Sequence, residues 1–255
     1  MTNPLITVIV PTYNHAKYIA EAIDSIIAQT IFTSTKVIVS DDCSSDGTFS
    51  IARATAQSLS NVEVIVNEAN LGIINHYRKL TELVDTPYVA VLEGDDYWIA
   101  DDKLEQQLAF LETFPDIGLC FTACIVEDEV LGAKWRQPNW PDGRHRLLTM
   151  LDLLDSNPVA TFSNCLYRSD RFRDALSYAD AKEGYDWLLN LTIAAKGGAA
   201  HVAKPSTLYR LHPNGTWTSL NSEHRKAAII RTLTAVGKRV DPAVRQFINA
   251  AVERL

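Results

Sequence analysis

Three apolar segments in the first hundred residues each end in a cluster of polar, turn-forming residues. The pairs of apolar segment and polar cluster are Leu5–Val10 with Pro11–Asn14, Lys36–Val39 with Ser40–Thr48, and Tyr88–Leu92 with Glu93–Asp96. Short apolar runs bounded by turn residues are typical of strands that are buried on both faces of a parallel sheet. The carboxyl ends of such strands meet at one edge of an open α/β sheet, where ligands bind. The sequence therefore predicts a ligand site at that edge, with an acidic loop suited to a divalent cation.

Segments with helical periodicity separate these strands. Residues 16–29 place Ile19, Ala22, Ile23 and Ile26 on one face, which is the spacing of an amphipathic helix. Further helices are expected at about 48–59, 73–83 and 103–114, and a further strand at 62–66. Alternating strands and helices predict a Rossmann-like, mostly parallel sheet that is flanked by helices.

The second half of the chain is less regular. We expect strands at 118–126, 161–167 and 207–211, helices at 146–154 and 186–195, and a loop or short hairpin over 130–144. From Ser222 onward the sequence predicts two helices that are broken near Asp241-Pro242. No flexible linker divides the chain, so a clean split into two domains is not expected.

Composition excludes several classes of partner. The chain has 255 residues, with 24 basic and 31 acidic side chains and a formal net charge of −7. A nucleic-acid partner is not expected, because no basic excess is present to neutralise phosphates. The four cysteines form no CxxC pair, which favours reduced, mostly buried thiols and a cytoplasmic location. No signal peptide is recognisable, and no apolar run approaches the roughly 18 residues of a transmembrane segment.

Six short motifs, in their order and spacing, resemble the inverting family-two glycosyltransferases of the GT-A fold. The motifs are Pro11-Thr12-Tyr13-Asn14, Asp41-Asp42 to Gly47-Thr48, Asn70-Leu71-Gly72, Glu93-Gly94-Asp95-Asp96, Tyr185-Asp186-Trp187, and Tyr209-Arg210-Leu211-His212 with Gly215 and Trp217. The resemblance covers roughly residues 5–220. It implies a GT-A domain over 1–220, with a nucleotide-binding half at 1–115 and a smaller acceptor-binding half at 116–220. Residues 221–255 would form a C-terminal helical extension.

The resemblance implies that the first loops bind a nucleoside-diphosphate sugar. An aspartate of the Asp41-Asp42 pair would hydrogen-bond the base, although these residues alone fit turn formation and helix capping better. Tyr13 has a ring that can stack on a base. The other residues expected to contact the donor are Pro11, Asn14, Asn70, Gly72, Asp95 and Arg210, and Arg210 could instead pair with a nearby carboxylate.

Asp95 and Asp96 are adjacent carboxylates that follow an apolar strand. A hard cation such as Mg²⁺ or Mn²⁺ would explain why they coexist, while a solvated acidic loop is an equal alternative on the residues alone. The resemblance implies that they bind metal and ribose, and that His212 completes the metal shell or contacts the diphosphate. Glu93 lies where many members carry an aspartate. The other histidines, which we expect to be structural or on the surface, are His15, His76, His145, His201 and His224.

Asp186 is the predicted general base. It opens a helix, where helix capping is the alternative role. Many members of the family carry Glu-Asp near this place, whereas this chain has Glu183-Gly184-Tyr185-Asp186. Glu183 is therefore the second candidate for the base.

The resemblance implies metal-dependent transfer of a sugar to a hydroxyl of a growing surface glycan or lipid-linked sugar. A UDP-sugar is the expected donor, with dTDP- and GDP-sugars as alternatives, and the Trp135–Gly143 loop is a candidate acceptor wall. A lipid-linked acceptor would allow peripheral membrane contact. The alternatives are a nucleotide-sugar-binding protein without turnover and, less favoured, a sugar nucleotidyltransferase. The motifs of P-loop, NAD-binding and serine-hydrolase sites are missing from the sequence.

Overall fold

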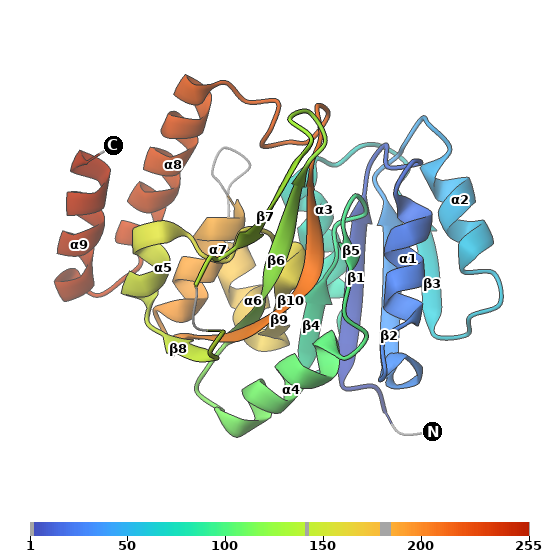
Figure 1. Ribbon diagram of the computed structural model, residues 1–255, viewed down its shortest axis with the longest axis horizontal. Helices are drawn as coiled ribbons and strands as arrows, with labels where there is room; N and C mark the ends of the chain where they lie inside the picture. The colour runs from blue at the N-terminus through green and yellow to red at the C-terminus, as the bar shows by residue number, and fades with distance from the viewer. Residues whose placement is uncertain (1–2, 141–142, 179–184, 255) are drawn as a thin grey trace.

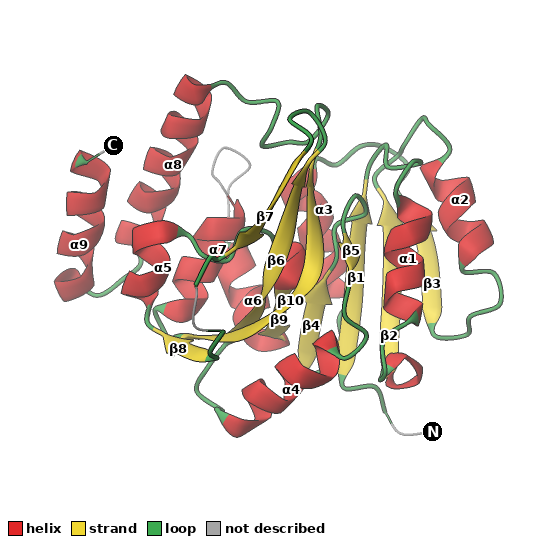
Figure 2. Cartoon of the chain, in the orientation of Figure 1, coloured by secondary structure: helices red, strands yellow, loops and turns green. Residues whose placement is uncertain are grey.

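The computed structural model describes residues 3–140, 143–178 and 185–254. Its sheet runs in the order β3-β2-β1-β4-β9-β6-β10-β5, and helices pack on both faces (Figures 1 and 2). The first four strands along the chain are β1 (Ile6–Thr12), β2 (Thr35–Asp41), β3 (Val62–Val66) and β4 (Tyr88–Val91). Neighbouring pairs among them are parallel, as the sequence predicts.

Successive side chains of β1 point to opposite faces of the sheet, and this explains why helices cover both faces in the N-terminal half of the fold. Val8 and Val10 pack with α1 (Ile19–Ile27), α2 (Thr48–Thr55) and α4 (Lys103–Thr113). Ile9 points to the opposite core, which includes α3 (Ile73–Glu82), α6 (Ser169–Ser177) and α7 (Tyr185–Ala194). Successive side chains of a strand point to opposite faces, so a strand that is apolar throughout must be covered twice.

The second half continues the same sheet with antiparallel pairs. Its strands are β5 (Tyr97–Trp98), β6 (Leu119–Asp128), β7 (Ala133–Gln137), β8 (Arg146–Leu148), β9 (Cys165–Arg168) and β10 (Ala199–Leu211). β9 is antiparallel to both β4 and β6, and β10 returns parallel to β6. β7 forms a hairpin with β6, so the segment 130–144, expected to be a loop or short hairpin, supplies only the second strand of a hairpin that begins in β6.

Several local predictions for this half are wrong. The helix expected at 146–154 begins as β8, and α5 (Met150–Ser156) starts only after a capping box between Thr149 and Asp152. The strand expected at 207–211 is present, but it is only the end of the much longer β10. Neither α6 nor β5 was expected. The 161–167 segment is a 3₁₀ turn, Phe162–Asn164, followed by β9.

The two helices predicted beyond Ser222 are present as α8 (Ser222–Gly237) and α9 (Pro242–Glu253). Leu233 and Val236 of α8 and Ile248 of α9 belong to the same buried cluster as Leu188 and Leu189 of α7. α8 packs on α7, and α9 packs on α5 and α8 (Figure 1). None of the helices in the described ranges combines the length and the hydropathy needed to cross a bilayer.

The shared core predicts that α8 contributes to the stability of the whole fold. Leu233 is 1% exposed and Phe247 is 48% exposed. We expect Leu233→Ala to lower the free energy of unfolding by about 2–5 kcal/mol, because it leaves a cavity. The matched control Phe247→Ala should cost less than about 1 kcal/mol. Denaturant unfolding measures both, and equal small losses would show that α8 is only an appendage.

Candidate functional site

The carboxyl ends of β1, β2 and β4 meet at the upper edge of the sheet in Figure 1. Thr12 pairs with Asp41 at the ends of β1 and β2. The Gly94 amide donates to the carbonyl of Pro11 at 3.0 Å, which continues the contact between β1 and the loop after β4. The three polar loops that the sequence singles out are therefore neighbours in space.

The loop after β1 is braced against the loop after β2. Asn14 has a left-handed backbone, with φ of 55°. Its amide donates to the Ser44 hydroxyl at 2.7 Å, and its side-chain oxygen accepts from the Ser45 amide at 3.0 Å. Pro11 is buried at the end of β1, whereas Tyr13 is 47% exposed. This leaves the Tyr13 ring open at the sheet edge, where it can meet a ligand.

Asp41 and Asp42 are both buried and both organise loops. The Asp41 carboxylate accepts from the Ser44 amide at 3.0 Å and also from the Ser44 hydroxyl. The Asp42 carboxylate accepts from the Asn67 side chain at 2.7 Å. It also accepts from the amides of Leu71 at 3.0 Å and Gly72 at 3.1 Å. The turn-forming role therefore has direct geometric support, and base binding stays a prediction.

Asn70 and Gly72 complete this corner of the site. The Asn70 amide group donates to the Asp42 carbonyl at 3.2 Å, and its side-chain oxygen accepts from the Gly72 amide at 3.0 Å. Gly72 has a φ of 71° and directly precedes α3. Glycine adopts this conformation without the penalty that a Cβ would bring.

Asp95 faces two histidines. Its Oδ2 lies 3.0 Å from Nε2 of His212 and 3.6 Å from Nε2 of His15. The potential ligand atoms of these three residues all lie within 4.8 Å of one another. His15 therefore has partners that the sequence did not indicate, while its expected structural role stays a prediction. His15 has no motif partner nearby in sequence, and its neighbours come from the ends of β4 and β10.

Asp96 points away from this cluster into the protein. It is 1% exposed, and its Oδ1 accepts from the backbone amide of Arg210 at 2.9 Å. The Thr161 hydroxyl lies 3.3 Å from Oδ2 of Asp96 and 3.2 Å from Oε2 of Glu93. The Tyr77 hydroxyl donates to the other oxygen of Glu93 at 3.2 Å. Within the described residues, the printed hydrogen bonds to Asp96 and Glu93 therefore come from neutral hydroxyl and amide donors.

These surroundings shift the pKa values of the acidic groups in opposite directions. Burial, reinforced by the neighbouring Asp95 and Asp186, raises the pKa of Glu93 to about 8. Burial and the same kind of repulsion raise the pKa of Asp96 well above its usual value. Burial alone would also raise the pKa of Asp95, but attraction to His15 and the hydrogen bond from His212 outweigh it and lower that pKa. Asp95 is thus the ionised carboxylate of the loop.

Arg210 holds the acidic loop in place. Its guanidinium donates to the Asp95 carbonyl at 2.6 Å and pairs with Glu21 of α1. It also lies over the rings of Tyr18 and Tyr97, 4.9 and 4.8 Å from their centroids. The sequence left a phosphate and a nearby carboxylate as alternative partners for Arg210, and the carboxylate partner is present. A contact with the donor stays a prediction.

Asp186 lies in the first turn of α7 and is half-buried. Burial raises its pKa, although hydrogen bonds from the backbone amides of Trp187 and Asp186 oppose this rise. The negative charge of Asp186 is close enough to raise the pKa of Glu93. The structure therefore brings the predicted base to the acidic loop. Glu183, the other candidate, lies outside the described residues.

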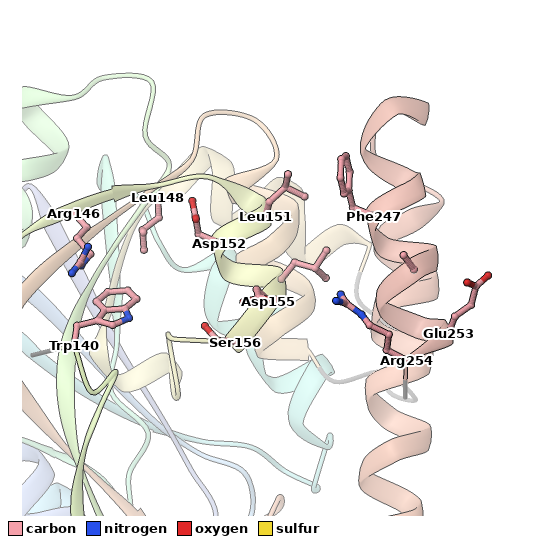
Figure 3. A pocket seen from close by; sticks show the side chains of 12 residues that line it. Trp140, Arg146, Leu148, Leu151, Asp152, Asp155, Ser156, Phe247, Glu253 and Arg254 are labelled. Carbon is pink, nitrogen blue, oxygen red and sulfur yellow. The ribbon is translucent and has the colours of Figure 1, made fainter.

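A groove of about 840 Å³ lies elsewhere, between β8 and α5 on one side and α9 on the other. Figure 3 shows Trp140 and Arg146 on one wall and Phe247 and Arg254 of the C-terminal segment on the other. Trp140, from the segment expected to form an acceptor wall, lines this groove, whereas none of the described residues predicted for the donor, the cation or the base does. The chemistry therefore belongs to the sheet edge.

Comparisons with known proteins agree with this architecture. Residues 7–176 match the model of the family described as glycosyl transferase family 2. An uncharacterized protein of Mycobacterium tuberculosis is 29% identical over 221 residues, which is 84% of this chain and 61% of that protein. The putative teichuronic acid biosynthesis glycosyltransferase TuaG of Bacillus subtilis is 38% identical over 113 residues, 44% of each chain. The chain thus spans about three-fifths of the length of the mycobacterial relative.

Two solved structures share the fold. Residues 1–349 of S. aureus TarS, in complex with UDP-GlcNAc, superpose with a TM-score of 0.78 at 20% identity, over 97% of this chain and 71% of that one. The mannosyltransferase PcManGT from Pyrobaculum calidifontis, in complex with GDP-Man and Mn²⁺, gives a TM-score of 0.68 at 18% identity. The superposition covers 99% of this chain and 70% of the PcManGT chain. This likeness confirms the predicted GT-A fold.

The pairing of Arg210 predicts a measurable contribution to stability. We expect Arg210→Ala to lower the free energy of unfolding by about 1–3 kcal/mol, because the Asp95 carbonyl loses its donor in a partly buried contact. Glu21→Gln should cost less than about 1 kcal/mol, since the Glu21 side chain is 53% exposed and its charge is screened by water. Urea unfolding compares the two. Equal losses would mean that the ion pair, and not the carbonyl contact, is what matters.

The raised pKa of Glu93 predicts a pH dependence. The native state favours the protonated carboxyl, so the stabilisation is complete below the ordinary value of 4.5 and is lost as pH rises through about 8. Without divalent cations, we expect wild type to lose stability relative to Glu93→Gln between pH 5 and 8. The slope should be at most about 1.4 kcal/mol per pH unit. Parallel curves for the two proteins would contradict the raised pKa.

Proposed function

Because this chain belongs to glycosyl transferase family 2, we propose that it moves a sugar from a nucleoside-diphosphate sugar to an acceptor hydroxyl, with inversion at the anomeric carbon. The observation that carries the proposal is the meeting of Asp95, His212 and the loops after β1 and β2 at one sheet edge. Family membership alone would leave open whether this chain keeps a competent site. The ionised Asp95 beside a buried histidine supports one.

The donor would lie across the loops after β1, β2 and β4. In the proposal, Pro11, Tyr13, Asn14 and Asp41 line the base and ribose, while Asp42 holds Asn70 and Gly72 in position beside them. The TarS structure contains UDP-GlcNAc and the PcManGT structure contains GDP-Man. Both UDP and GDP are therefore included in the binding test described below. A UDP-sugar is our first choice, and a dTDP-sugar is the third.

A divalent cation, Mn²⁺ or Mg²⁺, would be held by Asp95 and His212. Their facing atoms fit this role, because Asp95 is ionised and His212 presents Nε2 only 3.0 Å away. Asp96 would support the loop through the Arg210 amide, with its carboxyl turned inward. When bound, the cation neutralises the negative charge that grows on the departing nucleoside diphosphate.

Asp186 would act as the general base. Its carboxylate would accept the proton of the acceptor hydroxyl while that oxygen attacks the anomeric carbon on the face opposite the diphosphate. The raised pKa of Asp186 makes it a stronger base than an ordinary aspartate. Glu183 remains the alternative base. The sheet edge would hold donor and acceptor in line, which itself supplies much of the rate.

The acceptor would be approached from residues 116–220, with residues 1–115 holding the donor. Trp135 on β7 is 42% exposed and could form part of an acceptor wall with the following loop to Gly143. We propose a growing surface glycan or lipid-linked sugar as the acceptor, in polysaccharide biosynthesis in the cytoplasm. The putative role printed for TuaG supports this class. Residues 221–255 would serve as a helical extension of the 1–220 domain.

A nucleotide-sugar-binding protein without turnover is the second candidate. The observation that favours it is the chain's departure from the Glu-Asp pair, since Gly184 and Tyr185 separate Glu183 from Asp186. Such a protein would bind the nucleotide-sugar at the same site but would not transfer the sugar to an acceptor. The two are separated by measuring binding and transfer independently.

Nucleotide binding tests the donor and metal site. We expect calorimetry with UDP, GDP and dTDP to show Mn²⁺-dependent binding of one nucleotide. Asp95→Asn should weaken that binding about tenfold or more, because the ionised ligand is lost. Asp85→Asn, at an exposed carboxylate in an ion pair with Lys36, is the matched control and should change nothing. Binding that is equally strong without metal would contradict the assigned role of Asp95.

Transfer kinetics test the base. Asp186→Asn should lower kcat by about 10²–10⁴-fold while leaving nucleotide affinity unchanged, because it removes only the proton acceptor. Asp155→Asn, on the exposed face of α5, controls for a general loss of charge. Donor binding by wild type with no transfer to any glycan acceptor, and no donor hydrolysis, would favour the binding protein instead.

A further inference from the structure

We propose that His15 is a third protein ligand of the divalent cation, and that the resulting pair of histidines with one carboxylate selects transition-metal cations over Mg²⁺. The inference rests on the proposed function, because it concerns the same cation. It adds a residue from the loop after β1 that no motif in the sequence indicates as a ligand.

The distances among the three side chains suit a shared ion. Two ligand atoms that lie at right angles, each about 2.1 Å from a cation, are about 3 Å apart. Asp95 Oδ2 is 3.0 Å from His212 Nε2 and 3.6 Å from His15 Nε2. All the ligand atoms fall within 4.8 Å of one another. Only a small closure around the cation is therefore needed.

The fold itself holds His15 in this position. Its backbone amide donates to the Thr48 hydroxyl at 2.9 Å, and the next amide, of Ala16, donates to Asp46 at 3.0 Å. The other ring nitrogen, Nδ1, is buried against Gly94, where an added Cβ would lie only 3.0 Å away. Nε2 is thus the ring nitrogen that faces Asp95.

The composition of this set determines which cations it prefers. Two imidazoles and one carboxylate on one side of an ion leave its other positions open to phosphate oxygens or water. Mg²⁺ strongly prefers oxygen ligands, whereas first-row transition metals accept imidazole nitrogen readily. A site with only Asp95 and His212 would discriminate less, so His15 is the residue that sets the preference.

Ligation by His15 would also join the two ends of the donor site. His15 directly follows Tyr13 and Asn14, the residues proposed to contact the base and ribose. A cation bound to His15 would therefore fix the loop that receives the nucleotide, in addition to its contact with the diphosphate.

Spectroscopy of bound Mn²⁺ tests the proposal directly, without reference to turnover. Mn²⁺ alone is titrated into the full chain while electron paramagnetic resonance follows the free ion, and pulsed measurements count the directly bound imidazole nitrogens. We expect two nitrogens in wild type and one in His15→Gln, whose Mn²⁺ affinity should fall about tenfold or more. Mg²⁺ affinity, measured by competition, should change by less than about threefold. His224→Gln, at an exposed histidine on α8, is the control.

One bound nitrogen in wild type, or unchanged Mn²⁺ binding in His15→Gln, would overturn the proposal. The wild-type count decides the matter even if the variant fails to fold. If Asp95→Asn and His212→Gln still abolish Mn²⁺ binding in that case, the cation site of the proposed function stands without His15. No bound Mn²⁺ in wild type at millimolar concentration would overturn both.

Discussion

One partly buried carboxylate, that of Asp95, must stay ionised beside three other acidic groups. If Asp95, Glu93, Asp96 and Asp186 were all ionised, their negative charges would repel one another strongly. Different surroundings prevent this, because they favour ionisation of Asp95 and protonation of its neighbours. Asp96 is buried and Glu93 partly buried, and this removal from water, together with the neighbouring carboxylates, raises the pKa of each despite their neutral hydrogen-bond donors. Asp95 alone has His212 and His15 beside it, and they lower its pKa. The position of the negative charge, and with it the proposed place for a cation, follows from these opposite pKa shifts.

The surrounding fold serves to hold that arrangement. Parallel pairing of β1 with β2 and β4 brings the three loops to one edge, and Arg210 at the end of β10 ties the acidic loop to α1. The antiparallel strands of the second half are what bring β10 and α7 back to this edge. The C-terminal helices α8 and α9 stabilise α7, because apolar side chains of all three helices belong to one buried cluster and α8 packs directly on α7.

The first half of the fold was predictable because its signals are local. The strand at Val62–Val66 has the expected limits, and the loops after β1, β2 and β4 lie together as expected. The features that were not predicted depend on contacts between residues that are far apart in the sequence. β5 forms only against β10, and the extra length of β10 is defined by pairing with β6 and β8. His15 meets His212 and Arg210 meets Glu21 across nearly the whole chain, and no local pattern in the sequence encodes such a contact.

In the proposed function, Asp95 marks the position of the cation at the sheet edge that would bind the nucleotide. Anomalous diffraction from crystals grown with Mn²⁺ and UDP measures that position directly. If Asp95 holds the cation, we expect a single strong Mn²⁺ peak within about 2.3 Å of Asp95 Oδ2 and close to His212 Nε2, with the diphosphate on its open side. A peak bound instead to Asp96 or Glu93, or nucleotide bound at this edge with no Mn²⁺ beside Asp95, would contradict it.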